Sequence, residues 1–202
     1  VLHIADLAYT QDRYFAGTID EAALWDRPLT EQEITTVYGD GDGYIPANGV
    51  PIGDISITSA ENVTVNSIVN AASFLQQADS QIDGITIFDG AVDVTGAITV
   101  RNGTIDINAD ISSGDDMTFT SGRSTTYLEG NLSTTSDEIT FNGPVVITGD
   151  VFLDTSSGGG ADIDFNDVLD SDGTDTHVLV LSAGTAGRIT FTGSVGAGGS
   201  VY

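Results

Sequence analysis

One five-residue phrase returns three times in the second half of the chain and constrains the fold more than any other feature. The copies begin at Ile139, Ile163 and Ile189 and read ITFNG, IDFND and ITFTG, with starts 24 and 26 residues apart. Each copy has apolar residues at its first and third positions, a small polar residue between them and turn-forming residues after them. This alternation is typical of a short β-strand with one buried face. Its return at intervals of about 20 to 30 residues predicts a solenoid.

The residues between the copies repeat the alternation, with glycines between the apolar pairs of Val145–Ile147, Val151–Leu153 and Leu179–Leu181. Each repeat is therefore predicted to contain two or three short strands joined by tight corners. No repeat can bury its inner face alone, so we expect the repeats to stack about 4.8 Å apart. The predicted fold is all-β, a parallel β-helix over residues 54–202.

About seven coils are predicted, beginning at Ile55, Ile85, Ile98, Met117, Ile139, Ile163 and Ile189. Their inner wall is predicted to contain, in register, Ile139, Phe141, Ile163, Phe165, Ile189 and Phe191. The interval after Ile55 is irregular, and Val69–Gln77 is predicted to form either a helical turn or a bulged coil.

The charge of the 202-residue chain is strongly acidic, with 30 Asp and Glu residues, five arginines and a net charge of −25. Such a field repels phosphates, so we expect no nucleic-acid partner. It attracts divalent cations, of which calcium is the one available outside cells. The simpler interpretation is that the acidic residues keep a strand-rich surface soluble and discourage pairing between strand edges.

Three absences bear on the cellular setting. The chain has no cysteine, which excludes disulfides and thiolate metal sites and fits a bacterial exported protein. No apolar run approaches the roughly 18 residues of a membrane span, so we expect no membrane insertion. Val1–Ile4 begins within a strand pattern rather than a signal peptide, so we expect a matured product or part of a longer protein.

Residues 1–39 differ in character from the rest and contain the only Trp. They are predicted to form two strands and a helix, because Thr30 and Glu33 make a capping box and Gly39 is a left-handed helix cap. Residues 40–53, rich in Gly and Pro, are predicted to be a linker.

The phrase YFAGTIDEAALWDRPLTEQEITTVY, residues 14–38, resembles the last strands and terminal helix of laminin-G-like, concanavalin-type jelly rolls. The closing phrase of that family has the form F-x-G-x-I-D-E, then N/D-R-x-L, then E-I. The earlier strands of such a domain are missing, and two strands and a helix bury too little to form its core. We expect the segment either to cap the first coil or to add a strand to a neighbouring subunit, and we favour the cap because an open stack needs one.

Residues 73–100, 139–168 and 179–199 are similar to repeats of very large exported bacterial surface proteins of the filamentous-haemagglutinin type. The typical form is I-T-F-N-G-x-V-x-L-T-G-D-V-x-L-D-T-G, then D-I-x-F-N. This resemblance implies a right-handed β-helix, a secreted or cell-surface location and an architectural or adhesive role. Surface glycans as partners are implied by the jelly-roll resemblance alone. The last coil, Ile189–Tyr202, has no capping helix or proline, so we expect head-to-tail contact with another subunit or repeat.

A catalytic role is the competing class, because some parallel β-helices cleave polysaccharides. Gly114, Asp115 and Asp116 resemble the paired aspartates of polygalacturonases, but the accompanying phrases of that family are absent and a turn is expected here. His3 and His177 lack a nucleophile or second histidine at a suggestive spacing. We therefore expect a structural protein that is not an enzyme. The alternative is a β-helix that binds or cleaves polysaccharides.

Acidic loops supply candidate calcium ligands, with alternating carboxylates and glycines at Asp40 and Asp42 and at Asp170, Asp172 and Asp175. The jelly-roll resemblance implies a further ligand at Asp20. No loop continues to a full calcium-binding loop, and a polar turn is the simpler interpretation of each one alone. Three glycosylation sequons, at Asn62, Asn102 and Asn131, are expected by chance in a chain rich in Thr and Asn.

Overall fold

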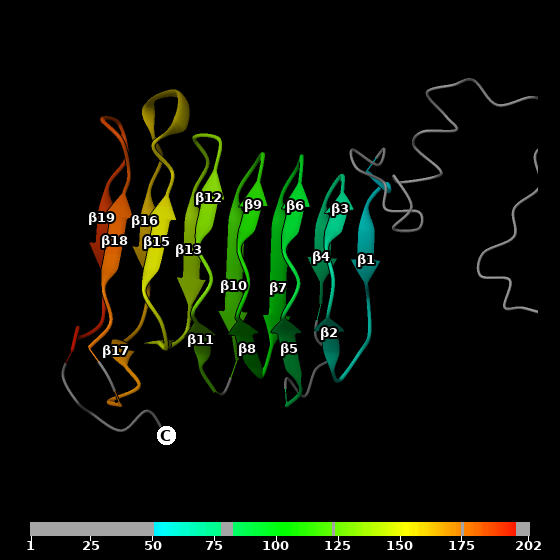
Figure 1. Cartoon of the computed structure of the whole chain (residues 1–202), viewed down its shortest axis with the longest axis horizontal. Coiled ribbons are helices and arrows are strands. Elements are labelled where there is room, and N and C mark those ends of the chain that lie inside the picture. Colours follow the sequence, from blue (N-terminus) through cyan, green and yellow to red (C-terminus); the bar gives the residue numbers. More distant parts are fainter. Residues whose placement is uncertain (1–50, 78–82, 123, 175, 197–202) are drawn as a thin grey trace, which may run out of the picture. The chain divides into compact units, whose positions relative to one another are not determined.

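The computed structural model of the chain describes residues 51–77, 83–122, 124–174 and 176–196. The segment of residues 1–39 predicted to form two strands and a helix, and most of the predicted linker, lie outside these residues. The described residues form nineteen β-strands and one short 3-10 turn, η2 (Ser157–Gly159), and they contain no α-helix (Figure 1).

The strands make three parallel sheets, to which successive strands of the chain contribute in rotation. Sheet 1 contains β1 (Ile55–Ile57), β4 (Phe74–Gln76), β7 (Ile98–Asn102), β10 (Met117–Ser121), β13 (Ile139–Asn142), β16 (Ile163–Phe165) and β19 (Ile189–Phe191). Sheet 2 contains β2 (Val63–Val65), β5 (Ile85–Phe88), β8 (Thr104–Ile107), β11 (Thr126–Leu128), β14 (Val145–Ile147) and β17 (Leu169–Ser171). Sheet 3 contains β3 (Val69–Ala71), β6 (Val92–Val94), β9 (Ile111–Ser113), β12 (Leu132–Thr134), β15 (Val151–Asp154) and β18 (Leu179–Ser182).

The predicted all-β stack of parallel coils is confirmed. Within each sheet a strand pairs with the strands three places before and after it in the chain, which is the connectivity of a parallel β-solenoid. About five turns, β4 to β18, lie between the first turn, β1 to β3, and the last strand, β19 (Figure 1).

The predicted coil start at Ile85 is wrong, because Ile85 begins β5 in sheet 2. Phe74 takes the corresponding place in sheet 1, and Val69–Gln77 contains strands β3 and β4 rather than a helical turn. The sequence pattern fails here because the fully buried Gln76 fills an inward position that Val100 and then Phe119 fill in the next two turns, and because the fully buried Ala71 is small. The other six predicted coil starts all begin strands of sheet 1. In that sheet only β4, which begins at Phe74, lies between two of them, Ile55 and Ile98.

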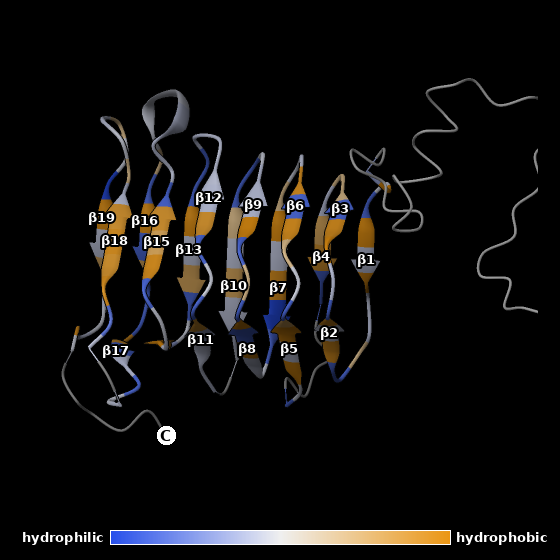
Figure 2. Ribbon diagram, in the orientation of Figure 1, coloured by the Kyte–Doolittle hydropathy of each residue, from blue (hydrophilic) through white to orange (hydrophobic). Residues whose placement is uncertain are grey.

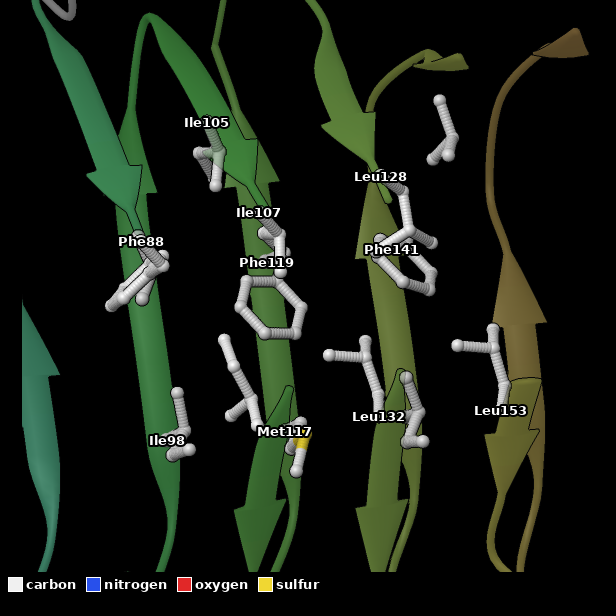
Figure 3. Close-up of a cluster of buried hydrophobic side chains, with 14 of the residues drawn as sticks. Phe88, Ile98, Ile105, Ile107, Met117, Phe119, Leu128, Leu132, Phe141 and Leu153 are labelled. Carbon is white, nitrogen blue, oxygen red and sulfur yellow. The ribbon is translucent and has the colours of Figure 1, made fainter. Parts of the chain in front are cut away.

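The core lies inside the solenoid, between the three sheets. Apolar side chains alternate with polar ones along most strands, and the apolar ones point inward (Figures 2 and 3). The predicted inner wall is confirmed, since Ile139 pairs with Ile163 and Phe141 with Phe165, and β19 continues the same register. Each fully buried aliphatic or aromatic side chain contributes about 1.5–3 kcal/mol relative to exposure.

An aromatic stack runs through four turns of sheet 1. The rings of Phe119, Phe141, Phe165 and Phe191 lie nearly parallel, with centroids 5.5, 5.1 and 5.3 Å apart. The separations follow from the spacing of about 4.8 Å between strands, because the same side chain occupies the same position in consecutive turns.

Candidate functional site at the acidic corner

The corner between sheet 3 and sheet 1 brings three carboxylates together. Asp115 and Asp116 lie in the bend between β9 and β10, where the sequence predicted a turn. Asp137 lies at the same corner one turn later, and one carboxylate oxygen of each residue lies within 4.8 Å of those of the other two. Asp115 and Asp116 are exposed and Asp137 is half-buried. We call these three residues the acidic corner.

Buried hydroxyl groups hold the backbone of this corner. The last inward residue of β9, Ser113, places its Oγ 2.6 Å from the carbonyl oxygen of Gly96 and 2.7 Å from that of Asp115. One turn later, Thr134 donates from Oγ1 to the carbonyl of Asp137 at 2.5 Å. These hydroxyls therefore supply hydrogen-bond partners for carbonyl groups at the corners.

Carboxylate and amide oxygens at the corners accept hydrogen bonds from the backbone of the next turn. Asp116 Oδ1 accepts from the N–H of Glu138 at 2.9 Å, and Asp162 Oδ1 accepts from the N–H of Arg188 at 2.7 Å. The same pattern recurs for Asn62 with Ile85, Asp110 with Asn131, Asn131 with Phe152 and Asp150 with Val178. Part of the acidity of the chain is therefore structural, because these side chains join one turn to the next.

The acidic corner leaves oxygen atoms available for further chemistry. The carboxylate of Asp115 accepts a hydrogen bond from the neighbouring N–H of Asp116 at 2.9 Å, and the hydroxyl of Thr135 donates to Asp137 Oδ2 at 3.4 Å. Clustered carboxylates can bind a hard cation such as calcium, or can serve as a general acid and base. Asp116 is already an acceptor for Glu138, which supports the structural interpretation of the Asp115–Asp116 pair. Asp137 was not predicted as a site residue from the sequence, because its position beside Asp115 and Asp116 depends on the length of the turn between them.

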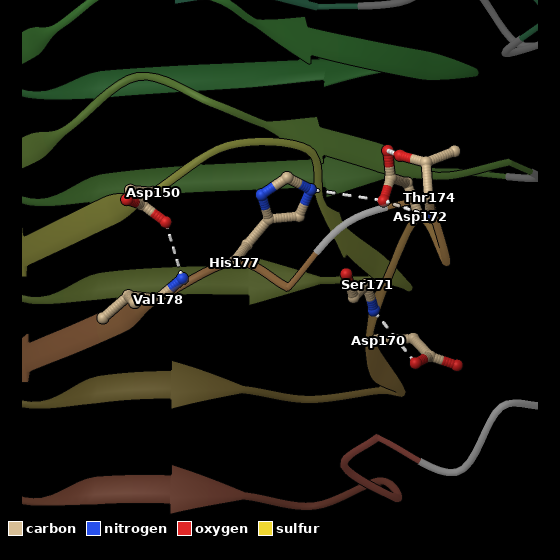
Figure 4. Close-up of polar contacts among 7 residues, drawn as sticks. All are labelled: Asp150, Asp170, Ser171, Asp172, Thr174, His177 and Val178. Atoms are coloured by element: carbon tan, nitrogen blue, oxygen red, sulfur yellow. Dashed lines mark hydrogen bonds and ion pairs between the residues drawn. The ribbon is translucent and has the colours of Figure 1, made fainter.

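Two predicted calcium ligands lie close together in the chain, Asp170 in β17 and Asp172 in the loop that follows it (Figure 4). Asp170 Oδ1 accepts from the N–H of Ser171 at 2.9 Å, whereas Asp172 accepts from the N–H and hydroxyl of Thr174. These bonds with Thr174 lower the pKa of Asp172 below its usual value, and His177 Nε2 lies 3.2 Å from Asp172 Oδ1. Each carboxylate is thus hydrogen-bonded to residues close to it in the chain, and calcium binding here stays a prediction.

Several predicted residues lie outside the part of the chain that the structure describes: His3, Asp20, Asp40, Asp42 and Asp175. The three sequons lie inside it, and all three asparagines use their side-chain amides in the fold. Asn102 is 1% exposed, so it is not accessible to a glycan-transferring enzyme.

A buried polar network links sheet 1 to sheet 2 and was not predicted. Gln76 Oε1 accepts from Thr86 Oγ1 at 2.9 Å, and Asn102 Nδ2 lies 3.0 Å from the same hydroxyl. Asn102 also bonds the carbonyl of Glu61 and accepts from the N–H of Gly103. Gln76, Thr86 and Asn102 are all buried, so the network lies in the interior and is shielded from solvent.

Comparisons with protein-family models, with curated proteins and with solved structures found no match. Among the described residues, no helix is long and apolar enough to cross a membrane.

Proposed function

We propose that the chain is a non-enzymatic structural or adhesive protein, a rod-like segment of a bacterial surface adhesin or extracellular filament. The observation that supports this best is the unbroken register of sheet 1 through all seven of its strands. Continuous backbone ladders with a stacked core give a stiff element, and six strand spacings make it roughly 30 Å long. The proposal includes a secreted or cell-surface location.

The finer details that the two family resemblances imply are part of this proposal. They suggest a right-handed helix of about seven coils of the filamentous-haemagglutinin type, preceded by a jelly-roll remnant at residues 1–39. That remnant would cap the first coil or add a strand to a neighbouring subunit, and it is the basis for surface glycans as partners. We expect neither nucleic-acid binding nor membrane insertion.

Acidic residues serve the proposed role in two ways. Those that accept backbone N–H groups, such as Asp116 and Asp162, join turns, while the exposed remainder keeps the rod dispersed. Calcium could bridge acidic surfaces, and the described places to test are the acidic corner and the segment that contains Asp170 and Asp172.

The competing proposal is a β-helix that binds or cleaves polysaccharides, favoured by the carboxylates gathered at the acidic corner. An uronate-release assay on acidic polysaccharides, with and without calcium, separates the two. We expect no product at any pH from the natural chain. Product release that disappears in the Asp115→Ala/Asp116→Ala variant would overturn the structural role. Asp110→Ala, which alters a different corner, is the matched control.

A further inference from the structure

The described part of the solenoid begins and ends at opposite edges of the same sheet. Among the described residues, β1 pairs only with β4 and β19 only with β16, and both are terminal strands of sheet 1. The last turn also exposes inward-column residues. Ile189 is 38% and Phe191 42% exposed, whereas the equivalent Ile163 and Phe165 one turn earlier are 0% and 1% exposed.

The register of sheet 1 defines how another turn would fit on this end. The column through Ile189 continues through each earlier strand to Ile55, and the column through Phe191 continues to Ile57. In sheet 2, Leu169 bridges to Val195, which is 56% exposed, and that column begins at Val63. A turn resembling β1 and β2 would therefore place apolar residues on all three exposed side chains.

Backbone hydrogen bonding repeats in the same columns. The first N–H of each strand in sheet 1 donates to the carbonyl of the corner residue one turn later, as Ile139 does to Asp162 and Ile163 to Arg188. Ile189 occupies the same position in β19, and the corner residue of a following first turn would be Asp54. The edge of β19 thus offers the donors that the edge of β1 is built to accept.

Charge is complementary at the same corner. The residues that directly precede the strands of sheet 1 form a column at the corner, and Arg188 is its last described member. The side chain of Arg188 is 73% exposed and pairs with Asp162 at 2.9 Å. Asp54 is the first described member of that column. It is exposed, and its carboxylate accepts a hydrogen bond from the hydroxyl of Ser73 at 2.8 Å. Stacking one copy on another would place the carboxylate of Asp54 next to the free side of Arg188.

We infer that the partner of the C-terminal end is a second copy of this chain, docked head-to-tail through its own first turn. This inference rests on the proposed structural role and names its partner. It also takes the second of the two uses given above for residues 1–39, strand addition to a neighbouring subunit, because a remnant that caps the first coil would cover the edge of β1. Ile189 lies against Ile55, Phe191 against Ile57 and Arg188 against Asp54 of the next copy. Both ends of each copy are used, so the contact is heterologous and repeats into a filament.

The net charge of −25 makes two copies repel each other. This repulsion acts over a longer range than the attraction between Arg188 and Asp54. Salt shortens the range of repulsion, from about 30 Å at 0.01 M to about 8 Å at 0.15 M. Association therefore increases with moderate salt, although the contact contains an ion pair.

Cysteine cross-linking of the full chain tests the register directly, because the natural sequence has no cysteine. Thr190 and Ser56 are the outward residues predicted to lie opposite each other, about 4.8 Å apart, which is within the range of a disulfide. A mixture of the Thr190→Cys and Ser56→Cys variants is expected to give the mixed disulfide dimer. Ser133→Cys, an exposed outward position in the middle of sheet 3, replaces Ser56→Cys as the control. Equal cross-linking to the control, or dimers of Thr190→Cys alone, would overturn the inference.

Charge reversal measured by sedimentation velocity tests the corner contact. Asp54→Arg and Arg188→Asp are each expected to weaken association by about tenfold, and the double variant to recover most of it. Arg101→Asp, on the outer face of β7, changes the net charge equally and should have little effect. Equal weakening by Arg101→Asp, or a wild-type chain that stays monomeric at every salt concentration while retaining its β-sheet spectrum, would refute head-to-tail docking. A monomeric chain inactive on polysaccharides would still leave the structural role in place.

Discussion

The two halves of sheet 1 fill the same interior column with different chemistry. In the first three turns the column contains Ile57, Gln76 and Val100, whereas every later turn places a phenylalanine there. Near Gln76 the interior is held by directed hydrogen bonds to Thr86 and onward to Asn102. In the later turns it is held by stacked rings that need only the regular spacing of the strands.

This difference shows that a repeating backbone does not determine which side chains fill the interior. An apolar stack gains from each additional identical neighbour and places few demands on direction. A buried polar group must find a partner, and Gln76 Nε2 has none among the described residues. The polar network therefore contributes less net stability than the aromatic stack, but it fixes one arrangement of the side chains in the interior.

The largest effect expected is from removing the centre of the aromatic stack. Phe141→Ala deletes a fully buried ring between Phe119 and Phe165 and should lower the free energy of unfolding by about 3–5 kcal/mol. Chemical denaturation followed by circular dichroism measures the change. Tyr127→Ala, at a 37% exposed aromatic residue on the outer face, is the control and should cost less than about 1 kcal/mol. Similar losses of unfolding free energy in both variants would mean that the stacked rings do not stabilise the later turns more than an exposed aromatic residue does.

A smaller loss is expected in the polar half. Asn102→Ala leaves the N–H of Gly103 and the carbonyl of Glu61 without their partner, and should cost about 1–3 kcal/mol. Asn142→Ala makes the same change on the exposed outer face of the later turns and should cost less than about 0.5 kcal/mol. If Asn102→Ala cost as much stability as Phe141→Ala, the expected ranking of the two halves would be wrong.

The corner column also differs between the halves, because Ala97 occupies the position that Asp116 occupies in the next turn. Asp116→Ala removes the acceptor for the N–H of Glu138 and should cost about 1 kcal/mol, whereas Asp116→Asn keeps an oxygen there and should cost less. Amide hydrogen exchange at Glu138 reports the bond directly and should accelerate only in the alanine variant. Unchanged exchange would show that the side chain does not hold the next turn.

The smallest effect is a difference in the response to pH. Burial, together with the carboxylates of Asp89 and Glu129, raises the pKa of Asp106 on β8, so its ionised form costs stability at neutral pH and the cost disappears as pH falls through that pKa. Hydrogen bonds from Ser156 lower the pKa of Asp154 on β15, so its contribution is present at neutral pH and is lost as pH falls through the lowered value.

Urea midpoints measured across acidic and neutral pH test this contrast. Asp106→Asn should stabilise the chain slightly at neutral pH and have no effect in acid, whereas Asp154→Asn should destabilise it at neutral pH only. Changes of the same sign in both variants would contradict the assigned causes.

The sequence predicted the later turns well because their inward positions are Ile and Phe at a nearly constant interval. It failed between Ile55 and Ile98 for a physical reason, since Ala71, Gln76 and Thr86 are buried there but do not show an apolar alternation. The pairing of turns also had to be known before Asp137 could be placed beside Asp116. Asn102 belongs to a sequon that resembles a surface turn, and nothing in its neighbours indicates that its amide is buried.

The phenylalanine stack has a consequence for how damage would spread along the protein. Each ring contacts its counterparts in the adjacent turns, so the core is a series of local contacts rather than one shared centre. A break at one level would separate the chain into two stretches, each still holding most of its own interior. Whole repeats could likewise be gained or lost during evolution with only the junction needing repair.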